Sequence, residues 1–165
     1  LISELRENKL DFALIEGIFD KSKYESRLLR QEKFTGICAC THPFAQKKVK
    51  FSDVFPETLI VREKGSGTRD ILERELCEFG FSIEMFRRHS EISSFSMINR
   101  LISNGTGISF AYNSVIKDED GIATFKVDGM NYRHEFNIVW LKHTILSEES
   151  ENFLSLIEGG TVEDE

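Results

Sequence analysis

Short apolar runs alternate with segments of helical periodicity along the whole chain. The apolar runs are too short for core helices, and turn-forming residues such as Asn8 and Pro56 separate several of them. We therefore expect strands at residues 10–15, 34–40, 58–62, 84–92, 107–112, 125–127 and 136–141.

Helical spacing is clearest between residues 68 and 79. The segment Gly65-Ser66-Gly67 precedes it and Gly80 follows it, which are the usual start and stop signals. Its expected core face consists of Ile71, Leu72, Leu76 and Phe79.

Three further helices are predicted. One lies at the N-terminus around Leu5, and one covers residues 95–104. The last begins after Ser147, which can cap it. The expected core face of this last helix is Phe153, Leu156 and Ile157.

The alternation of strands and helices predicts an α/β fold with mixed, mainly parallel sheets and helices on both faces. Ligands of such sheets bind beyond the carboxyl ends of the strands, where loops lead into helices. Three loops take that place here, at residues 15–17, 63–68 and 93–96. We therefore expect a binding site among them.

Composition and net charge exclude some classes of function for these residues. The chain has 165 residues, 40% of them hydrophobic, and a net charge of −7. An acidic chain lacks the clustered lysine and arginine that phosphate contacts need, so we expect no DNA binding by these residues. No apolar stretch approaches the roughly 20 residues of a membrane helix, so we expect no membrane partner. The chain starts at Leu1 inside a helical pattern, so we expect a protein that was longer at its N-terminus.

A Cys-x-Cys-x-His pattern, formed by Cys38, Cys40 and His42, raises the question of a metal site. Thiolates and imidazole are good zinc or copper ligands. On a strand, however, side chains of one face stand roughly 6 to 7 Å apart, too far to converge on one ion. We therefore expect no metal and no cofactor, and free thiols as in a reducing cytoplasm. Redox sensing through a disulfide is a weaker alternative to free thiols, since Cys77 has no evident cysteine partner in the sequence.

The loop Gly65-Ser66-Gly67-Thr68-Arg69 can hold an anion, because glycines admit a ligand to the backbone and helix starts present N–H groups. Its spacing is not that of a nucleotide P-loop. The alternative is that Ser66 or Thr68 only caps the helix. Both interpretations stay open for this loop, and the same ambiguity applies to the serines of residues 93–96.

Five motifs follow one another in an order and spacing that resembles LysR-type effector-binding domains. The resemblance extends from about Leu1 to the C-terminal helix, and the glycine loop with the later Gly-x-Gly-Ile signature is its most specific part. The motifs are Leu10 to Leu14, His42-Pro43-Phe44-Ala45, Phe51-Ser52-Asp53-Val54, Arg62 to Arg69, and Ile98 to Phe110 with Asn104-Gly105-Thr106-Gly107-Ile108.

This resemblance implies a two-lobed fold like that of type-2 periplasmic binding proteins, with a small, anionic effector in the cleft. The first lobe would comprise residues 1–58 and 127–165, and the second residues 59–126. Family members also carry an N-terminal DNA-binding domain and a first strand and helix, and we expect none of these within residues 1–165. The first lobe is thus expected to be incomplete, and promoter DNA to be bound only through the missing domain. A homodimer or higher homo-oligomer is expected.

The resemblance assigns the effector contacts unevenly. Ser93, Ser94 and Phe95 are the main candidates in the second lobe, and Glu16, Gly17 and Thr41 in the first. Ser66 and Thr68 rank second, since they could face the cleft or a cap. Arg69 could counter an effector carboxylate, although an arginine early in an exposed helix is more often solvated.

Three classes of function remain to be weighed. A ligand-sensing domain of a cytoplasmic transcriptional regulator is favoured by the resemblance. A free-standing solute-binding receptor would fit the fold but needs an export signal. An enzyme needs a convergent acid, base or nucleophile, and none is visible, since Ser66 has no Gly-x-Ser-x-Gly elbow. We therefore expect no catalytic residues.

Overall fold

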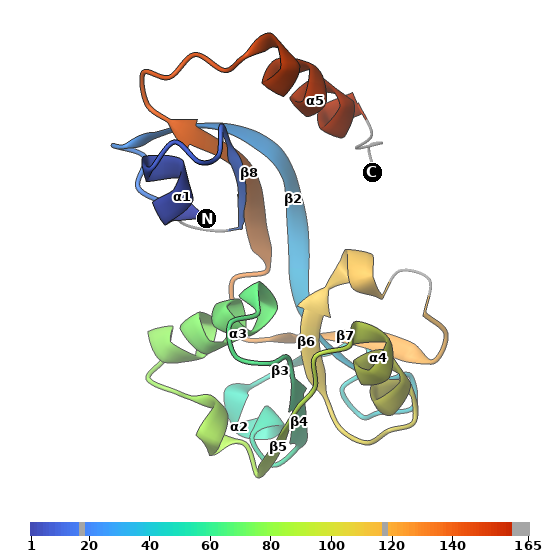
Figure 1. Cartoon of the computed structure of the whole chain (residues 1–165). Helices are drawn as coiled ribbons and strands as arrows, with labels where there is room; N and C mark the ends of the chain where they lie inside the picture. Colours follow the sequence, from blue (N-terminus) through green and yellow to red (C-terminus); the bar gives the residue numbers. More distant parts are fainter. Residues whose placement is uncertain (17–18, 117–118, 160–165) are drawn as a thin grey trace. The chain divides into compact units, whose positions relative to one another are not determined.

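The computed structural model describes residues 1–16, 19–116 and 119–159. Helices and strands alternate along the chain (Figure 1), which confirms the predicted α/β class. The elements are α1 (Ile2–Arg6), β1 (Ala13–Glu16), β2 (Tyr24–Ala39), β3 (Lys48–Val49), α2 (Phe51–Val54), β4 (Thr58–Val61), α3 (Gly67–Glu78), η1 (Ile83–Met85), β5 (Arg88–Glu91), α4 (Phe95–Ser103), β6 (Ser109–Tyr112), η2 (Asn113–Val115), β7 (Ile122–Val127), β8 (Arg133–Leu141) and α5 (Glu148–Gly159).

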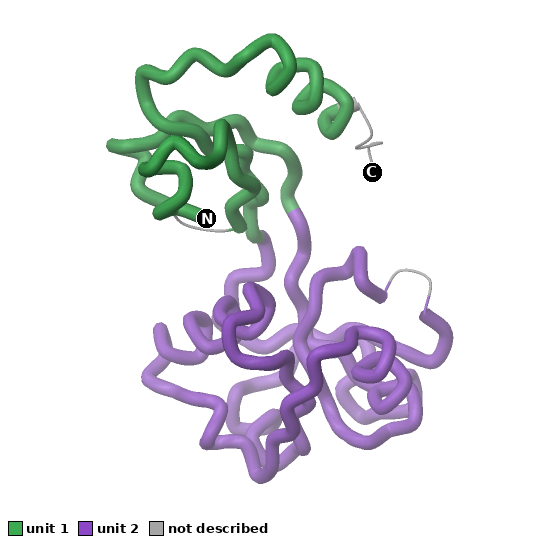
Figure 2. The backbone as a smooth tube through the Cα atoms, in the orientation of Figure 1, with its two compact units in different colours: residues 1–31, 134–165 green, residues 32–133 purple. Residues whose placement is uncertain are grey.

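The chain forms two compact units, which Figure 2 colours separately. Unit 1 consists of Leu1–Gln31 and His134–Glu165, and unit 2 of Glu32–Arg133. These boundaries differ from those of the predicted lobes, which placed residues 32–58 in the first part. The physical reason is that the second half of β2 pairs with β6 and β7 inside unit 2. How the units correspond to lobes that close on a ligand stays a prediction.

The sheets are mixed. Antiparallel pairing joins β1 to β8 and β2 to both β6 and β7. Parallel pairing joins β3 to β7 and β4 to β5, and a parallel bridge connects Leu59 to Ile108. The larger sheet has the order β1-β8-β2-β7-β3, with β6 also on β2. The parallel pair β4 and β5 positions the starts of α3 and α4, because these helices follow the two strands directly.

Unit 2 has a core in which strands and α4 meet. Ile98 and Ile102 of α4 are buried against the apolar side chains of β2, β4 and β6. Their spacing of four residues places both on one face of the helix, which is why the sequence pattern predicted this element. The cluster also contains Ile37, Ile60 and Ala111.

Unit 1 contains the last helix, whose orientation differs from the prediction. Ser147 caps it as expected, accepting a hydrogen bond from Ser150 N at 3.1 Å. The predicted core face is wrong for Phe153 and Leu156, which are 54% and 76% exposed, whereas Leu154 is fully buried. The contacts of α5 are partly polar, so apolar periodicity alone misplaced its inner face.

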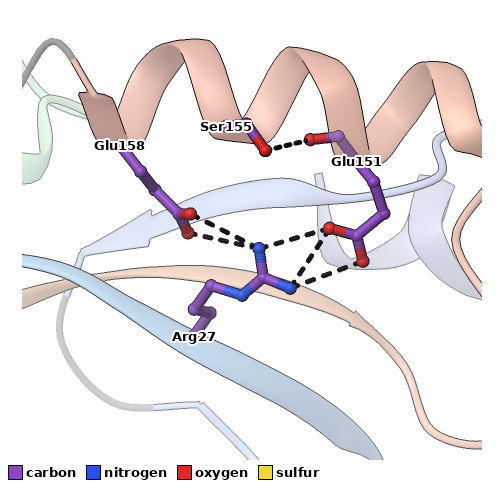
Figure 3. Close-up of polar contacts among 4 residues, drawn as sticks. All are labelled: Arg27, Glu151, Ser155 and Glu158. Atoms are coloured by element: carbon purple, nitrogen blue, oxygen red, sulfur yellow. Dashed lines mark hydrogen bonds and ion pairs between the residues drawn. The ribbon is translucent and has the colours of Figure 1, made fainter.

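An arginine of β2 holds α5 in this orientation. Arg27 donates to Glu151 at 3.2 Å and to Glu158 at 3.3 Å, so one guanidinium spans two turns of the helix (Figure 3). The centroid of the Trp140 ring lies 5.8 Å from the same guanidinium.

In the parts of the chain that the structure describes, no helix is long and apolar enough to cross a membrane.

Candidate functional site

The carboxyl ends of β4 and β5 lie side by side in unit 2. Val61 and Glu91 are partners in the parallel register, and Ile92 N donates to Val61 O at 2.9 Å. The loops that follow these two strands run directly into α3 and α4. This is the arrangement at which open α/β sheets bind ligands. We call it the strand-end site, formed by residues 62–69 and 91–96.

Arg69 fastens the two loops to each other. Its guanidinium donates to Glu91 Oε2 at 2.5 Å, to the carbonyl of Arg62 at 3.2 Å and to Glu73 Oε1 at 2.7 Å. The hydrogen bonds to Glu73 and Glu91 raise the pKa of Arg69, and the one from Arg69 lowers the pKa of Glu91. Arg69 is only 6% exposed, so the expectation of a solvated charge is wrong. In the structure, the Arg69 side chain therefore connects the loop after β4 to the end of β5 by hydrogen bonds.

Arg62 and Glu63 are features of this edge that the sequence reasoning missed. The Arg62 guanidinium lies 4.1 Å from the centroid of the Phe95 ring, and its Nε and Nη2 donate to Glu63 at 2.8 and 2.9 Å. These hydrogen bonds lower the pKa of Glu63 to about 2. A signal existed, because Arg62 ends the strand predicted over residues 58–62 and Glu63 opens the predicted binding loop at residues 63–68. The stacking on Phe95 could not be seen without the parallel pairing of β4 and β5.

The serines of the two loops differ in their hydrogen bonds. Ser94 is the N-cap of α4, where its hydroxyl accepts from Met97 N at 3.4 Å and lies 2.9 Å from Ser96 Oγ. Ser93 is exposed beside it. Ser66 takes the N-cap position of α3, but its hydroxyl makes no cap hydrogen bond. The capping interpretation therefore fits Ser94 and not Ser66. Thr68 is half-buried in the first turn of α3.

The structure thus groups five of the predicted contact residues at one edge: Ser66, Thr68, Ser93, Ser94 and Phe95. Of the remaining three predicted contact residues, two lie in other parts of the fold and one lies outside the residues that the structure describes. Glu16 ends β1 in unit 1, and Thr41 is exposed in the turn after β2. Gly17 lies outside the described residues.

The cysteine and histidine pattern has a separate explanation in the fold. Cys38 is buried in β2, which raises its pKa to about 11, while Cys40 is exposed in the following turn. His42 Nδ1 accepts a hydrogen bond from Phe44 N at 3.2 Å, which stabilises that turn. Among residues 1–16, 19–116 and 119–159, no three histidine, cysteine or acidic side chains gather closely enough to hold a metal ion. Cys77 is exposed on α3.

Comparison with known proteins places this geometry in a family. The family model described as the LysR substrate binding domain matches residues 1–160. The transcriptional regulator CysL of Bacillus subtilis is 27% identical over 90% of this chain and 49% of its own length. The transcriptional activator CmpR of Synechocystis is 31% identical over 73% of this chain and 40% of its own length. The chain therefore spans about half the length of such relatives, or less.

A solved structure agrees with the fold. The regulatory domain of CcmR from Synechocystis, determined in complex with 2-PG, superimposes with a TM-score of 0.78 at 19% identity. The similarity covers 97% of this chain and 77% of that one. The fold is thus that of LysR regulatory domains, which resemble type-2 periplasmic binding proteins, as the sequence motifs predicted. On the match over residues 1–160, this chain belongs to the LysR substrate binding domain family.

Proposed function

We propose that this chain senses a small anionic metabolite for a LysR-type transcriptional regulator, and that the strand-end site supplies the contacts from unit 2. The observation that carries the proposal is the side-by-side emergence of two hydroxyl-bearing loops after β4 and β5. Ser93 is exposed at this edge, and the Ser66 hydroxyl is not used as a cap. Helix starts and hydroxyl groups together favour an oxyanion.

The arginines of the site shape it more than they neutralise a ligand. Arg62 and Arg69 both donate to carboxylates of their own chain. An effector would then be held chiefly by neutral donors on a rigid frame. Phe95, half-buried under Arg62, would give an apolar wall to the carbon part of the ligand. Glu16, Gly17 and Thr41 stay candidates for the contacts from the rest of the chain.

The whole protein is proposed to act as a cytoplasmic homo-oligomer that reads promoter DNA through residues outside this chain. The charge of −7 supports this division, because DNA backbones repel an acidic surface. A solute receptor is not favoured, since the relatives CysL and CmpR are both named as transcriptional regulators. An enzymatic role is not proposed either, because those relatives regulate transcription and the strand-end site pairs its carboxylates with arginine.

A ligand screen followed by two serine variants tests this proposal. We expect one member of a panel of small carboxylates and phosphates to raise the thermal midpoint, because a ligand of the folded state stabilises it. Ser93→Ala should then weaken that ligand about tenfold or more, since a hydrogen bond to a charged group contributes roughly 1.5 to 3 kcal/mol.

Ser94→Ala separates binding from capping. Loss of the hydrogen bond by which Ser94 caps α4 at Met97 N should lower the free energy of unfolding by about 1 kcal/mol, whatever happens to the affinity for the ligand. Ser103→Ala, at the far end of α4, is the matched control and should leave affinity unchanged. Equal affinity in wild type, Ser93→Ala and Ser94→Ala would remove these serines from the effector site.

A further inference from the structure

A hollow lies in unit 2 at the starts of β4 and β5, the strands whose carboxyl ends form the strand-end site. It has a volume of about 700 Å³ and is lined by Thr58, Glu84, Phe86, Arg87, Arg88, His89, Ser90 and Thr106. Thr58 opens β4 and is paired with Arg88, which opens β5. We call it the strand-start hollow. It shares no residue with the strand-end site and does not rest on the function proposed for that site.

Backbone hydrogen bonds make the walls of the strand-start hollow rigid. Arg87 N donates to Phe55 O at 2.7 Å, and Ile108 N donates to Thr58 O at 2.9 Å. Gly107 permits this close approach, because a Cβ there would lie 2.2 Å from the Thr58 carbonyl oxygen. Three chain segments are therefore locked together around the hollow, and a ligand would not have to order them.

The side chains of the hollow are suited to an oxyanion. Arg87 and Arg88 are exposed and, unlike Arg62 and Arg69, form no ion pair within the described residues. Two unpaired guanidinium groups on adjacent residues are strong donors to phosphate or carboxylate oxygens.

Other hydrogen-bonding side chains complete the lining. The hydroxyls of Thr58, Ser90 and Thr106 and the imidazole of His89 also line the hollow. Glu84 is the one carboxylate among the lining residues, which also include two arginines. Phe86 is buried and packs on Phe55 at 5.3 Å, so the floor is apolar and fixed.

We infer that the strand-start hollow is a second anion site, which binds a small molecule carrying a phosphate or a similar doubly charged oxyanion group. Bound there, the anion would bridge Arg87 and Arg88 at the start of β5, Thr58 at the start of β4 and Thr106 in the loop before β6. A chain with a net charge of −7 would otherwise attract anions poorly, so binding at this hollow would depend on these two arginines.

The test is a titration of the 165-residue chain with inorganic phosphate at constant ionic strength, followed by backbone amide NMR shifts. Saturable shifts are expected at Thr58, Thr106 and residues 87–90. The double variant R87Q/R88Q should weaken binding at least tenfold, since it removes both charged donors. R100Q/R133Q changes the net charge equally at exposed arginines that do not line the hollow, and should bind as wild type.

Each other outcome overturns the inference. Absence of saturable binding would do so, and so would equal weakening in R87Q/R88Q and R100Q/R133Q, which would indicate a general charge effect. Shifts confined to residues 62–69 and 91–96 would place the phosphate at the strand-end site. That last result would contradict the second site while supporting the proposed effector site.

Discussion

Replacing Arg69 with methionine should loosen the strand-end site and destabilise unit 2. Methionine keeps the apolar stem of the buried side chain but removes all its hydrogen bonds. The ion pairs with Glu73 and Glu91 involve carboxylates that are each 47% exposed, so each contributes about 0.2 to 1 kcal/mol. The hydrogen bond to the Arg62 carbonyl adds about 1 kcal/mol. The sum predicts a loss of about 2 kcal/mol in the free energy of unfolding.

Urea denaturation at neutral pH measures this loss directly. The matched control is Arg74→Met on the same helix, since Arg74 is half-buried and forms no ion pair within the described residues. Its free energy of unfolding should change by less than about 0.5 kcal/mol. A double-mutant cycle between Arg69→Met and Glu91→Gln should show coupling, because the two side chains share a hydrogen bond. Equal stability of Arg69→Met and Arg74→Met would refute the claim that the hydrogen bonds of Arg69 stabilise unit 2.

Three further predictions concern other parts of the chain. Arg27→Met should cost about 1 kcal/mol and speed amide exchange along α5, and unchanged exchange would show that the helix does not need this clamp. Gly36→Ala should cost roughly 1 to 3 kcal/mol, because its Cβ would lie 2.3 Å from the buried ring of Phe125; a stability equal to wild type would contradict that packing. The Glu63 carboxylate should titrate near pH 2 by NMR, and Arg62→Gln should return its pKa toward about 4.3. The stability from this ion pair is complete above the ordinary glutamate pKa and is lost as pH falls through about 2, so a titration already near pH 4 in wild type would argue against the pair.

The fold was predictable where burial leaves a periodic pattern. Helices α3 and α4 began and ended within a residue or so of prediction, because glycines and serines mark their ends and apolar residues recur on their buried faces at helical spacing. The first half of β2 was missed, since most of its side chains are exposed and several of them are charged. The strand predicted over residues 84–92 is a 3-10 turn followed by β5, whose residues are all exposed.

The candidate site was predictable only in part, for a related reason. The serines could be named because they follow predicted strands and precede predicted helices. The burial of Arg69 depends on Glu91, which is 22 residues further along the chain. The stacking of Arg62 on Phe95 likewise depends on the pairing of β4 with β5. Local sequence carries no sign of either contact.

Amide hydrogen exchange with and without the ligand found by the thermal screen tests the central claim most directly. Bound ligand should slow exchange in residues 63–69 and 92–97, where the two loops enter their helices. Exchange across the strand-start hollow, residues 84–90, should stay the same unless that ligand also occupies the second site. Protection that leaves residues 63–69 and 92–97 untouched would contradict the assignment of the effector site to the carboxyl ends of β4 and β5.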